Sequence, residues 1–285
     1  MKSLGYYNGK FGPIEEMMIP MNDRVSYFGD GVYDATYSAN GVIYTLDEHM
    51  DRFFNSAGLL KINIPLSKDE MKGILYEMLA KVDSDENFIY WQTTRGTGMR
   101  SHAFLSNDMP ANIWIVIKPD KVKDLSQKIR LITAEDTRFY HCNIKTLNLL
   151  VNVMASQKAT EMGCNECVFH RGDRVTECAH SNIHIIKDGV FKTAPTDHLI
   201  LPGIARAHLI KMCKKHNIPV DEAPFTVEEL FNADEILISS AGSFCLAACE
   251  IDGIPCGGKA PEILKTLQDG LTEEFETETK KSLIQ

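Results

Sequence analysis

A polar stretch near the middle of the 285-residue chain limits what it can fold into, because it divides the apolar sequence into two parts. Residues 118–127 contain five charged side chains and no aromatic one. We therefore predict an α+β or α/β protein of two domains. A small N-terminal α/β domain is expected at residues 1–118, a linker at 119–127 and a larger domain at 128–285.

The composition of the chain excludes several classes of protein and partner. Hydrophobic residues make up 44% and charged residues 24%, which are ordinary values for a globular protein. The formal net charge of −9 repels a nucleic-acid backbone, so we expect no nucleic-acid partner. No apolar stretch has the length of a signal peptide or a membrane span, so we expect a cytoplasmic protein without membrane contact. The eight cysteines are too sparse for a disulfide scaffold and are expected to be reduced thiols.

Turn signals and apolar periodicity predict an α+β first half. Asn8-Gly9 and Asn40-Gly41 are hairpin signals, so residues 4–45 are expected to form short strands broken by turns. Apolar residues then recur twice at helical spacing, the second time behind a Ser-x-x-Glu capping box. The two helices are predicted at 46–60 and 67–82, and two further strands at 88–94 and 113–117.

The second half is predicted to mix strands and helices in the same way. A hairpin is expected to turn at residues 171–173, where Arg-Gly-Asp separates two apolar runs. Strands are predicted at 129–133, 183–186 and 236–239, and helices at 147–162, 204–216 and 262–280.

Lys145 is a candidate nucleophile. It is the only formally charged side chain between Arg138 and Lys158. Apolar surroundings disfavour an ammonium ion, and a neutral lysine amine attacks carbonyl groups and forms Schiff bases. The alternative is a lysine whose stem packs on the surface while its amine reaches water.

The segment after Glu86 is a candidate anion site in an otherwise acidic chain. No acidic residue occurs between Glu86 and Asp108, whereas Arg100 and His102 lie within that segment. Two residues apart in an extended segment, these side chains would point to the same side and could hold a carboxylate. A solvated surface loop is the alternative.

Two turns built of small residues could bind a phosphate through their backbone amides. Gly203 leads into a predicted helix, whose first amides belong to Ile204 and Ala205. Ser240-Ala241 follows a predicted strand and has the same capacity, although each could equally be an ordinary turn. The Cys-x-x-Cys at residues 164–167 has no second pair at metal-binding spacing, so we predict no metal site.

Four motifs occur in an order typical of one enzyme family. They are Asp23-Arg24-x-x-x-Phe28-Gly29-Asp30-Gly31-Val32-Tyr33-Asp34, His49-x-x-Arg52, Ile144-Lys145-x-Leu147-Asn148 and Thr176-Glu177-x-x-x-Ser181-Asn182. With these motifs the sequence resembles the class IV, fold type IV aminotransferases, which use pyridoxal 5'-phosphate. The likeness runs over residues 5–275 and implies that the larger domain is β-barrel-like, carries helices and binds the cofactor.

The resemblance implies a role for each matching residue. Lys145 would bond covalently to the cofactor and carry the proton between substrate and cofactor. Glu177 would pair with the pyridine nitrogen and keep it protonated. Arg52 would hold the phosphate together with backbone amides, which are those of Ile204, Ala205 and Ala241.

The resemblance extends to the substrate side of the site. Tyr33 would line the substrate pocket, and Arg138 would lie near the ring oxygen of the cofactor. The segment Thr94-Arg95-Gly96-Thr97-x-x-Arg100-x-His102 is similar to the carboxylate-binding loop of the D-amino-acid branch of the family. In that branch Arg100 and His102 would reach the pocket of a neighbouring subunit, which implies a homodimer with shared active sites.

The reaction implied is ping-pong transfer of an amino group between a D-amino acid, such as D-alanine, and a 2-oxo acid, such as 2-oxoglutarate. The alternatives on the same fold are a branched-chain L-aminotransferase and an aminodeoxychorismate lyase. A non-enzymatic anion-binding protein is a third possibility. Three positions depart from the family pattern: Ala205 and Ala241 lack the hydroxyl groups usual around the phosphate, and His180 replaces a small residue after Glu177.

Overall fold

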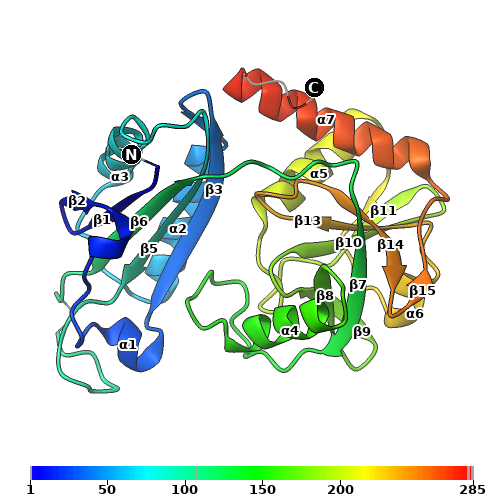
Figure 1. Ribbon diagram of the computed structural model, residues 1–285. Helices are drawn as coiled ribbons and strands as arrows, with labels where there is room; N and C mark the ends of the chain where they lie inside the picture. Colours follow the sequence, from blue (N-terminus) through cyan, green and yellow to red (C-terminus); the bar gives the residue numbers. More distant parts are fainter. Residues whose placement is uncertain (1, 107, 281–282, 284–285) are drawn as a thin grey trace. The chain divides into compact units, whose positions relative to one another are not determined.

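The computed structural model describes residues 2–106, 108–280 and 283, and the chain forms two compact units (Figure 1). The first unit comprises Met1–Lys121, Ile144–Asn148 and Thr277–Ser282; the second comprises Val122–Asn143, Leu149–Glu276 and Leu283–Gln285. The domain boundaries expected from the sequence stay a prediction. The structure adds that two short segments of the second half of the chain belong to the first unit.

A six-stranded antiparallel sheet forms the centre of the first unit, in the order β2-β1-β6-β5-β3-β4. Its strands are β1 (Leu4–Tyr7), β2 (Lys10–Gly12), β3 (Gly31–Ala39), β4 (Val42–Ile43), β5 (Glu86–Thr94) and β6 (Asn112–Pro119). Both predicted hairpins are confirmed, since Asn8 and Asn40 adopt positive φ and the strands on either side pair. The expectation of short strands is wrong for β3, which runs for nine residues.

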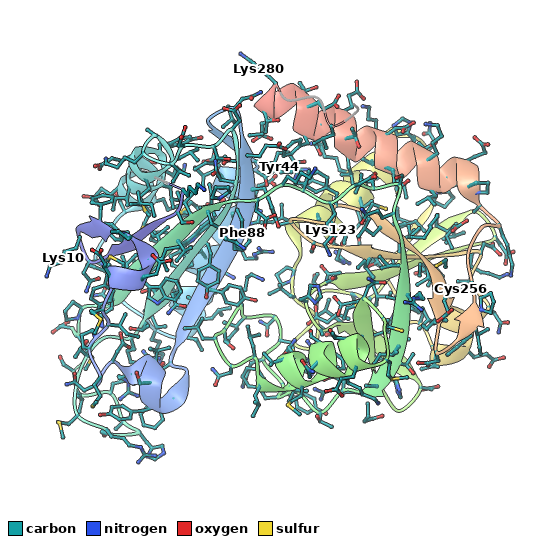
Figure 2. All side chains as sticks on the ribbon, in the orientation of Figure 1. Lys10, Tyr44, Phe88, Lys123, Cys256 and Lys280 are labelled. Atoms are coloured by element: carbon teal, nitrogen blue, oxygen red, sulfur yellow. The ribbon has the colours of Figure 1, made fainter. Side chains whose placement is uncertain are left out.

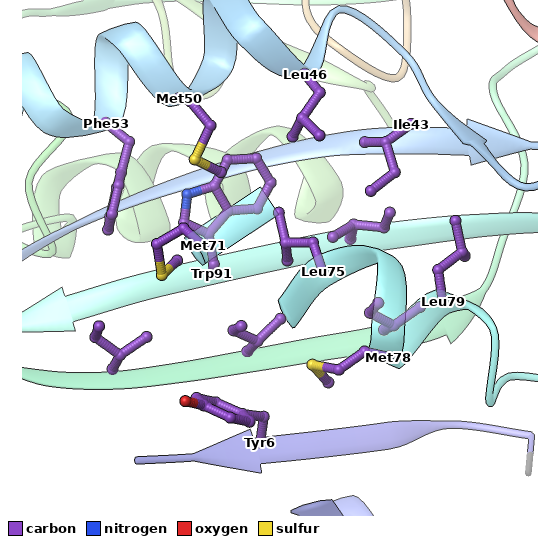
Figure 3. Packing of buried hydrophobic residues seen from close by; sticks show 14 of the residues in the cluster. Tyr6, Ile43, Leu46, Met50, Phe53, Met71, Leu75, Met78, Leu79 and Trp91 are labelled. Atoms are coloured by element: carbon purple, nitrogen blue, oxygen red, sulfur yellow. The ribbon is translucent and has the colours of Figure 1, made fainter. Parts of the chain in front are cut away.

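Two amphipathic helices cover one face of this sheet, α2 (Leu46–Leu59) and α3 (Lys68–Leu79). The predicted capping box of α3 is present, with Ser67 and Glu70 each bonded to the other's backbone. Both helices turn apolar side chains toward the sheet, where fully buried Trp91 of β5 lies at the centre of the cluster (Figure 3). Shorter elements missed by the sequence analysis are α1 (Arg24–Phe28) and a 3₁₀ turn, η1 (Ile14–Glu16).

Half-buried aromatic side chains of β3 and β5 pack in pairs across the two strands. Tyr33 stacks on Tyr90 with ring centroids 5.4 Å apart. Tyr37 meets the edge of Phe88, which is labelled in Figure 2, at the same distance of 5.4 Å. Burial, with a smaller contribution from Asp120, raises the pKa of Tyr37 to about 12, so the phenol is uncharged at neutral pH.

A nine-stranded sheet forms the second unit, in the order β12-β11-β10-β13-β14-β7-β8-β9, with β15 paired to β14. Its strands are β7 (Lys128–Glu135), β8 (Glu166–Arg171), β9 (Arg174–Cys178), β10 (Asn182–Lys187), β11 (Val190–Thr193), β12 (Val220–Asp221), β13 (Glu235–Ser239), β14 (Leu246–Ile251) and β15 (Ile254–Pro255). The end strand β9 leads by a tight turn into β10, where the Cys178 amide donates to the Ser181 carbonyl. Since this turn joins a strand at one end of the order to one near the other end, the sheet curls on itself as a β-barrel-like domain requires.

The helices of the second unit are α4 (Leu150–Glu161), α5 (Ile204–Lys215), α6 (Val227–Phe231) and α7 (Pro261–Thr279). The prediction that the first of them begins at residue 147 is wrong. Thr146 forms a β-bridge with Val32, and the Leu147 amide donates to the Gly31 carbonyl, so α4 begins only after these residues. None of the helices in the described part of the chain has both the length and the apolar character that a membrane crossing requires.

Candidate active site

Lys145 lies in the first unit, held at its backbone between β3 and α2. Its carbonyl accepts from the Tyr33 amide at 3.0 Å, and its amide donates to the Ser56 hydroxyl at 3.3 Å. The half-buried side chain places Nζ 4.4 Å from the centroid of the Tyr33 ring. The close approach of the 144–148 segment to β3 requires Gly31, because a Cβ there would lie 2.7 Å from a methyl of Leu147 and 2.4 Å from the Thr93 carbonyl.

A buried charge cluster lies near this amine, centred on Asp34 of β3. Its carboxylate accepts from Arg52 Nε at 2.9 Å and from Arg52 Nη2 at 2.7 Å. His49 Nδ1 lies 2.7 Å from the same carboxylate, and both Asp34 and His49 are buried. His49 and Arg52 are three residues apart on α2 and therefore share one face of that helix. Asp34 of the neighbouring strand thus orients both His49 and Arg52 of α2.

The pKa values of this cluster follow from burial and charge. Burial alone would raise the pKa of Asp34, but the charge of Arg52 and the bonds from Arg52 and His49 outweigh burial and hold that pKa below its ordinary value. Burial lowers the pKa of His49, and the charges of Arg52 and Lys145 lower it further, against the opposing effect of Asp34. Asp34 is thus ionised and His49 uncharged at neutral pH.

Replacing Asp34 by Asn should cost about 3–5 kcal/mol in free energy of unfolding at pH 7, because it removes the buried negative charge that pairs with the largely buried guanidinium of Arg52. A carboxyl whose folded pKa is lowered stabilises above its unfolded pKa, and this stabilisation is lost as the pH falls through the folded pKa. The difference between wild type and Asp34→Asn should therefore shrink below about pH 4. Urea unfolding at several pH values measures it.

The matched control is Asp51→Asn, on the same helix, whose carboxylate is 69% exposed and pairs with Lys68. Exposed ion pairs contribute little, so this variant should change the free energy of unfolding by less than about 1 kcal/mol. Equal losses for the two variants, or a loss for Asp34→Asn that is independent of pH, would contradict the assignment.

Arg100 and His102 lie against one ring in the first unit. The Arg100 guanidinium is 5.1 Å from the centroid of Phe28, and the His102 ring is 5.1 Å from the same centroid. The segment that carries them is not extended, contrary to the expectation. Arg24 donates to the Ser101 carbonyl and the Gly98 amide donates to Asn22, and these bonds bend the loop. The two side chains nevertheless come together, and both are exposed.

Glu177 lies in the second unit, at the end of β9, and is buried within a balanced group of charges. One carboxylate oxygen accepts from Arg138 Nη1 at 2.5 Å, and the other accepts from the Leu201 amide at 2.9 Å. Arg138 also forms a two-point contact with Asp136, which lies 3.3 Å from Arg171. Burial opposes the charge of Arg138, but the carboxylates of Asp136 and Glu177 raise its pKa above the ordinary value.

The two predicted phosphate turns lie in the second unit, on either side of Asn182. Asn182 pairs with Ser239, which precedes the Ser240-Ala241 turn, and its side-chain amide donates to the Leu201 carbonyl before α5. Gly203 begins α5 so close to it that a Cβ would lie 1.9 Å from Asn182 Oδ1.

The backbone amides at these turns are suited to an anion. The amides of Ile204, Ala205 and Ala241 have no hydrogen-bond partner among the residues that the structure describes. Unbonded amides at the start of a 12-residue helix attract negative charge, so the donors present fit a phosphate group.

His180, which follows Glu177 by three residues, contacts a second buried acid, Glu166. Its Nδ1 lies 2.8 Å from the carboxylate of buried Glu166, which also accepts from the Ser181 hydroxyl. The imidazole is thereby turned toward β8, with 53% of its side chain exposed. An effect of His180 on substrate range stays a prediction.

The structure therefore groups the predicted site residues in two sets. Lys145, Arg52, Tyr33, Arg100 and His102 belong to the first unit, and Glu177, Arg138, Ile204, Ala205 and Ala241 to the second. The sequence analysis missed the part played by Asp34 and by Asp136, which aim Arg52 and Arg138. A signal for Asp34 was present, since it is the only charged residue on β3. Within the described part of the chain, no group of three or more His, Cys, Asp and Glu side chains could hold a metal ion.

Comparison with known proteins shows which family this chain resembles. The family model for amino-transferase class IV matches residues 31–251. A D-alanine aminotransferase of Listeria monocytogenes serotype 4b (strain F2365) is 38% identical over 266 residues, which cover 92% of each chain. A D-alanine aminotransferase of Staphylococcus aureus (strain MSSA476) is 36% identical over 275 residues, covering 95% of this chain and 98% of the relative.

Solved structures agree on the fold. The branched-chain amino acid aminotransferase from Escherichia coli matches with a TM-score of 0.87 at 22% identity. The match covers 100% of this chain and 97% of that one. At this identity the likeness shows a common fold and leaves the substrate open.

Proposed function

This chain belongs to the class IV aminotransferases, which use pyridoxal 5'-phosphate, and we propose that it transfers the amino group of a D-amino acid such as D-alanine to a 2-oxo acid such as 2-oxoglutarate. The cofactor, when bound, supplies an aldehyde that bonds to amines and a ring that takes up electrons from the substrate Cα. The residues of the chain supply binding, orientation and proton transfer.

Lys145 is the proposed acid-base residue. Its backbone is held by Tyr33 and Ser56, so Nζ starts from a defined place beside the Tyr33 ring. We propose that this amine would hold the cofactor in the resting enzyme and that its Nζ would carry the proton from the substrate Cα during turnover.

The remaining contacts hold the cofactor. Glu177, which accepts a hydrogen bond from Arg138, would pair with the ring nitrogen and keep it protonated. Arg52, aimed by Asp34, would bind the phosphate in this proposal, as would the unbonded amides of Ile204, Ala205 and Ala241. Arg138 stays the proposed neighbour of the ring oxygen.

The observation that carries the choice of D-substrates is the placement of Arg100 and His102 against the Phe28 ring in this chain. Its similarity to several D-alanine aminotransferases supports the same choice. Two donors on a bent loop can hold an α-carboxylate on one side. A fixed carboxylate decides which enantiomer presents its Cα hydrogen to Lys145, while Tyr33 lines the pocket.

We propose a homodimer in which Arg100 and His102 complete the partner's pocket. Exposed apolar side chains on α4 support association, since Leu150 is 76% and Met154 63% exposed. We also propose a cytoplasmic enzyme, because the eight cysteines are unpaired thiols of the kind that compartment keeps reduced.

The decisive experiment is an amino-donor panel with both enantiomers of alanine, glutamate and leucine and 2-oxoglutarate as acceptor (2-oxobutyrate for glutamate). We expect kcat/KM for D-alanine to exceed that for L-alanine by about 100-fold or more. In Arg100→Ala, KM for D-alanine should rise roughly 10- to 100-fold with a smaller change in kcat, because a charged hydrogen bond to the substrate is lost.

The matched control is Arg130→Ala, which removes an exposed arginine of the second unit and should leave both constants unchanged. Conversion of L-leucine without conversion of D-alanine would overturn the stereochemical proposal in favour of a branched-chain L-aminotransferase. Unchanged affinity of Arg100→Ala for D-alanine would overturn the role of the loop.

A further inference from the structure

His184 of β10 is completely buried, and both of its ring nitrogens are hydrogen-bonded to hydroxyl groups. Nδ1 lies 2.8 Å from Thr193 Oγ1 of β11, and Nε2 lies 2.8 Å from Ser239 Oγ of β13. The ring stacks on Phe191 with centroids 5.1 Å apart. Among the described residues no acidic side chain contacts this imidazole, and no step described above needs it.

The contacts of His184 continue to the first turn of α5. Thr193 Oγ1 accepts from Arg206 Nε at 3.2 Å, and Arg206 is itself buried. The Nη2 atom of Arg206 donates to the Ala194 carbonyl at 2.9 Å and to Glu222 at 2.8 Å. An unbroken series of polar contacts therefore runs from the start of α5 through His184 to the end of β13.

The chemistry of the groups sets the direction of these bonds. Burial and the charge of Arg206 lower the pKa of His184 to about 3, so the imidazole is neutral at pH 7. Arg206 can only donate hydrogen bonds, so the Thr193 hydroxyl accepts one from it. The other described partner of this hydroxyl is His184, so its O–H donates a hydrogen bond to Nδ1. Nε2 then carries the proton and donates to Ser239. A side chain at position 184 must therefore accept a hydrogen bond from Thr193 and donate one to Ser239.

Both ends of this series adjoin the turns assigned to the phosphate. Arg206 follows Ile204 and Ala205 directly, and Ser239 precedes Ser240-Ala241. The two turns also flank one residue, because Asn182 pairs with Ser239 and contacts the start of α5. Since Ala205 and Ala241 have no hydroxyl groups, the phosphate depends there on backbone amides, whose positions follow the backbone.

We infer that His184 is a positioning residue for the cofactor phosphate: it holds the start of α5 and the turn after β13 in the arrangement in which their amides converge on one anion. The inference rests on the proposed function, since it takes these amides to be the phosphate donors. It predicts that loss of His184 weakens binding of the phosphate group specifically.

The test compares two ligands that differ only in the phosphate, pyridoxal 5'-phosphate and pyridoxal. Their dissociation constants are measured with the apoenzyme in phosphate-free buffer by absorbance titration. His184→Phe fills the site but makes neither hydrogen bond. We expect it to weaken binding of pyridoxal 5'-phosphate by roughly tenfold or more and binding of pyridoxal by less than about twofold. His184→Gln, which can accept and donate, should restore most of the affinity.

Phe225→Leu, a cavity-forming change in the apolar core of the second unit, is the control for stability. It should lower Tm without changing the ratio of the two dissociation constants. If His184→Phe weakens binding of both ligands by the same factor, His184 is only a structural residue and the inference is overturned. If His184→Phe does not fold, Ser239→Ala and Thr193→Val each remove one end of the series and should show a smaller loss of the same selective kind. Equal effects on both ligands in these variants would again overturn the inference.

The wild-type protein separates this inference from the proposed function. If it binds pyridoxal 5'-phosphate no better than pyridoxal, the assignment of the phosphate site fails, and the inference fails with it. If it prefers the phosphate but His184→Phe keeps that preference, only the inference about His184 fails.

Discussion

Replacing Lys145 by Ala should lower transaminase turnover by about 10⁴-fold, because the variant loses the amine proposed to carry the proton at the substrate Cα. The backbone of residue 145 is tied to Tyr33 and Ser56, and Nζ lies 4.4 Å from the centroid of the Tyr33 ring. Turnover of D-alanine and 2-oxoglutarate, followed as pyruvate formed, measures the loss. Cofactor binding should persist in part through Arg52 and Glu177.

Lys158→Ala is the matched control, since it removes the next lysine along the chain, on α4. It should keep wild-type turnover. Borohydride reduction of the wild-type enzyme, followed by peptide mass spectrometry, should place the cofactor on Lys145. A label on another lysine, or near-normal turnover in Lys145→Ala, would disprove the assignment.

The second large effect is expected for Glu177→Gln, which should lower kcat by about 10²- to 10³-fold. The amide keeps the size of the side chain but not the negative charge that is proposed to pair with a protonated ring nitrogen. It also leaves Arg138 with Asp136 alone, so the buried charges no longer balance. Single-turnover rates with D-alanine measure the chemical step, and KM should change less than kcat.

Glu235→Gln provides the comparison, because Glu235 is also fully buried in the second unit and bonds to the Ala260 amide rather than to any proposed site residue. It should lower the free energy of unfolding while kcat stays within a few-fold of wild type. Equal losses of kcat in the two variants would mean that Glu177 acts only through stability. This outcome would contradict its proposed pairing with the ring nitrogen.

The elements that local signals specify were predictable. The helix at 68–79 follows from its capping box and apolar periodicity, and the hairpins at Asn8-Gly9 and Asn40-Gly41 follow from turn chemistry. The start of α4 was not predictable, because residues 146–147 pair with a strand more than 100 positions earlier. The two-residue strands β12 and β15 are too short for any periodicity to appear.

The same division applies to the candidate site. Lys145 stood out as an isolated charge in an apolar segment, and the two turns stood out through their small residues beside predicted elements. Glu177 and Arg52 stood out through the family motifs. The partners that aim them did not. Asp34 is recognised as the acid that holds Arg52 only when β3 lies beside α2. His184 looks like an ordinary strand residue until β11 and β13 bring Thr193 and Ser239 to its two nitrogens.

The sequence by itself determined the family and most helices, because caps, turns and apolar periodicity act over a few residues and motif order survives in the chain. It also predicted the candidate site residues. The tertiary structure alone decided which polar groups meet. Hydrogen bonds and ion pairs form between atoms within about 3 Å, and sheet order, which no local signal encodes, brings residues from distant parts of the chain to that distance. For this reason the orientation of Arg52, the charge balance around Glu177 and the neutral imidazole of His184 became visible only in the folded chain.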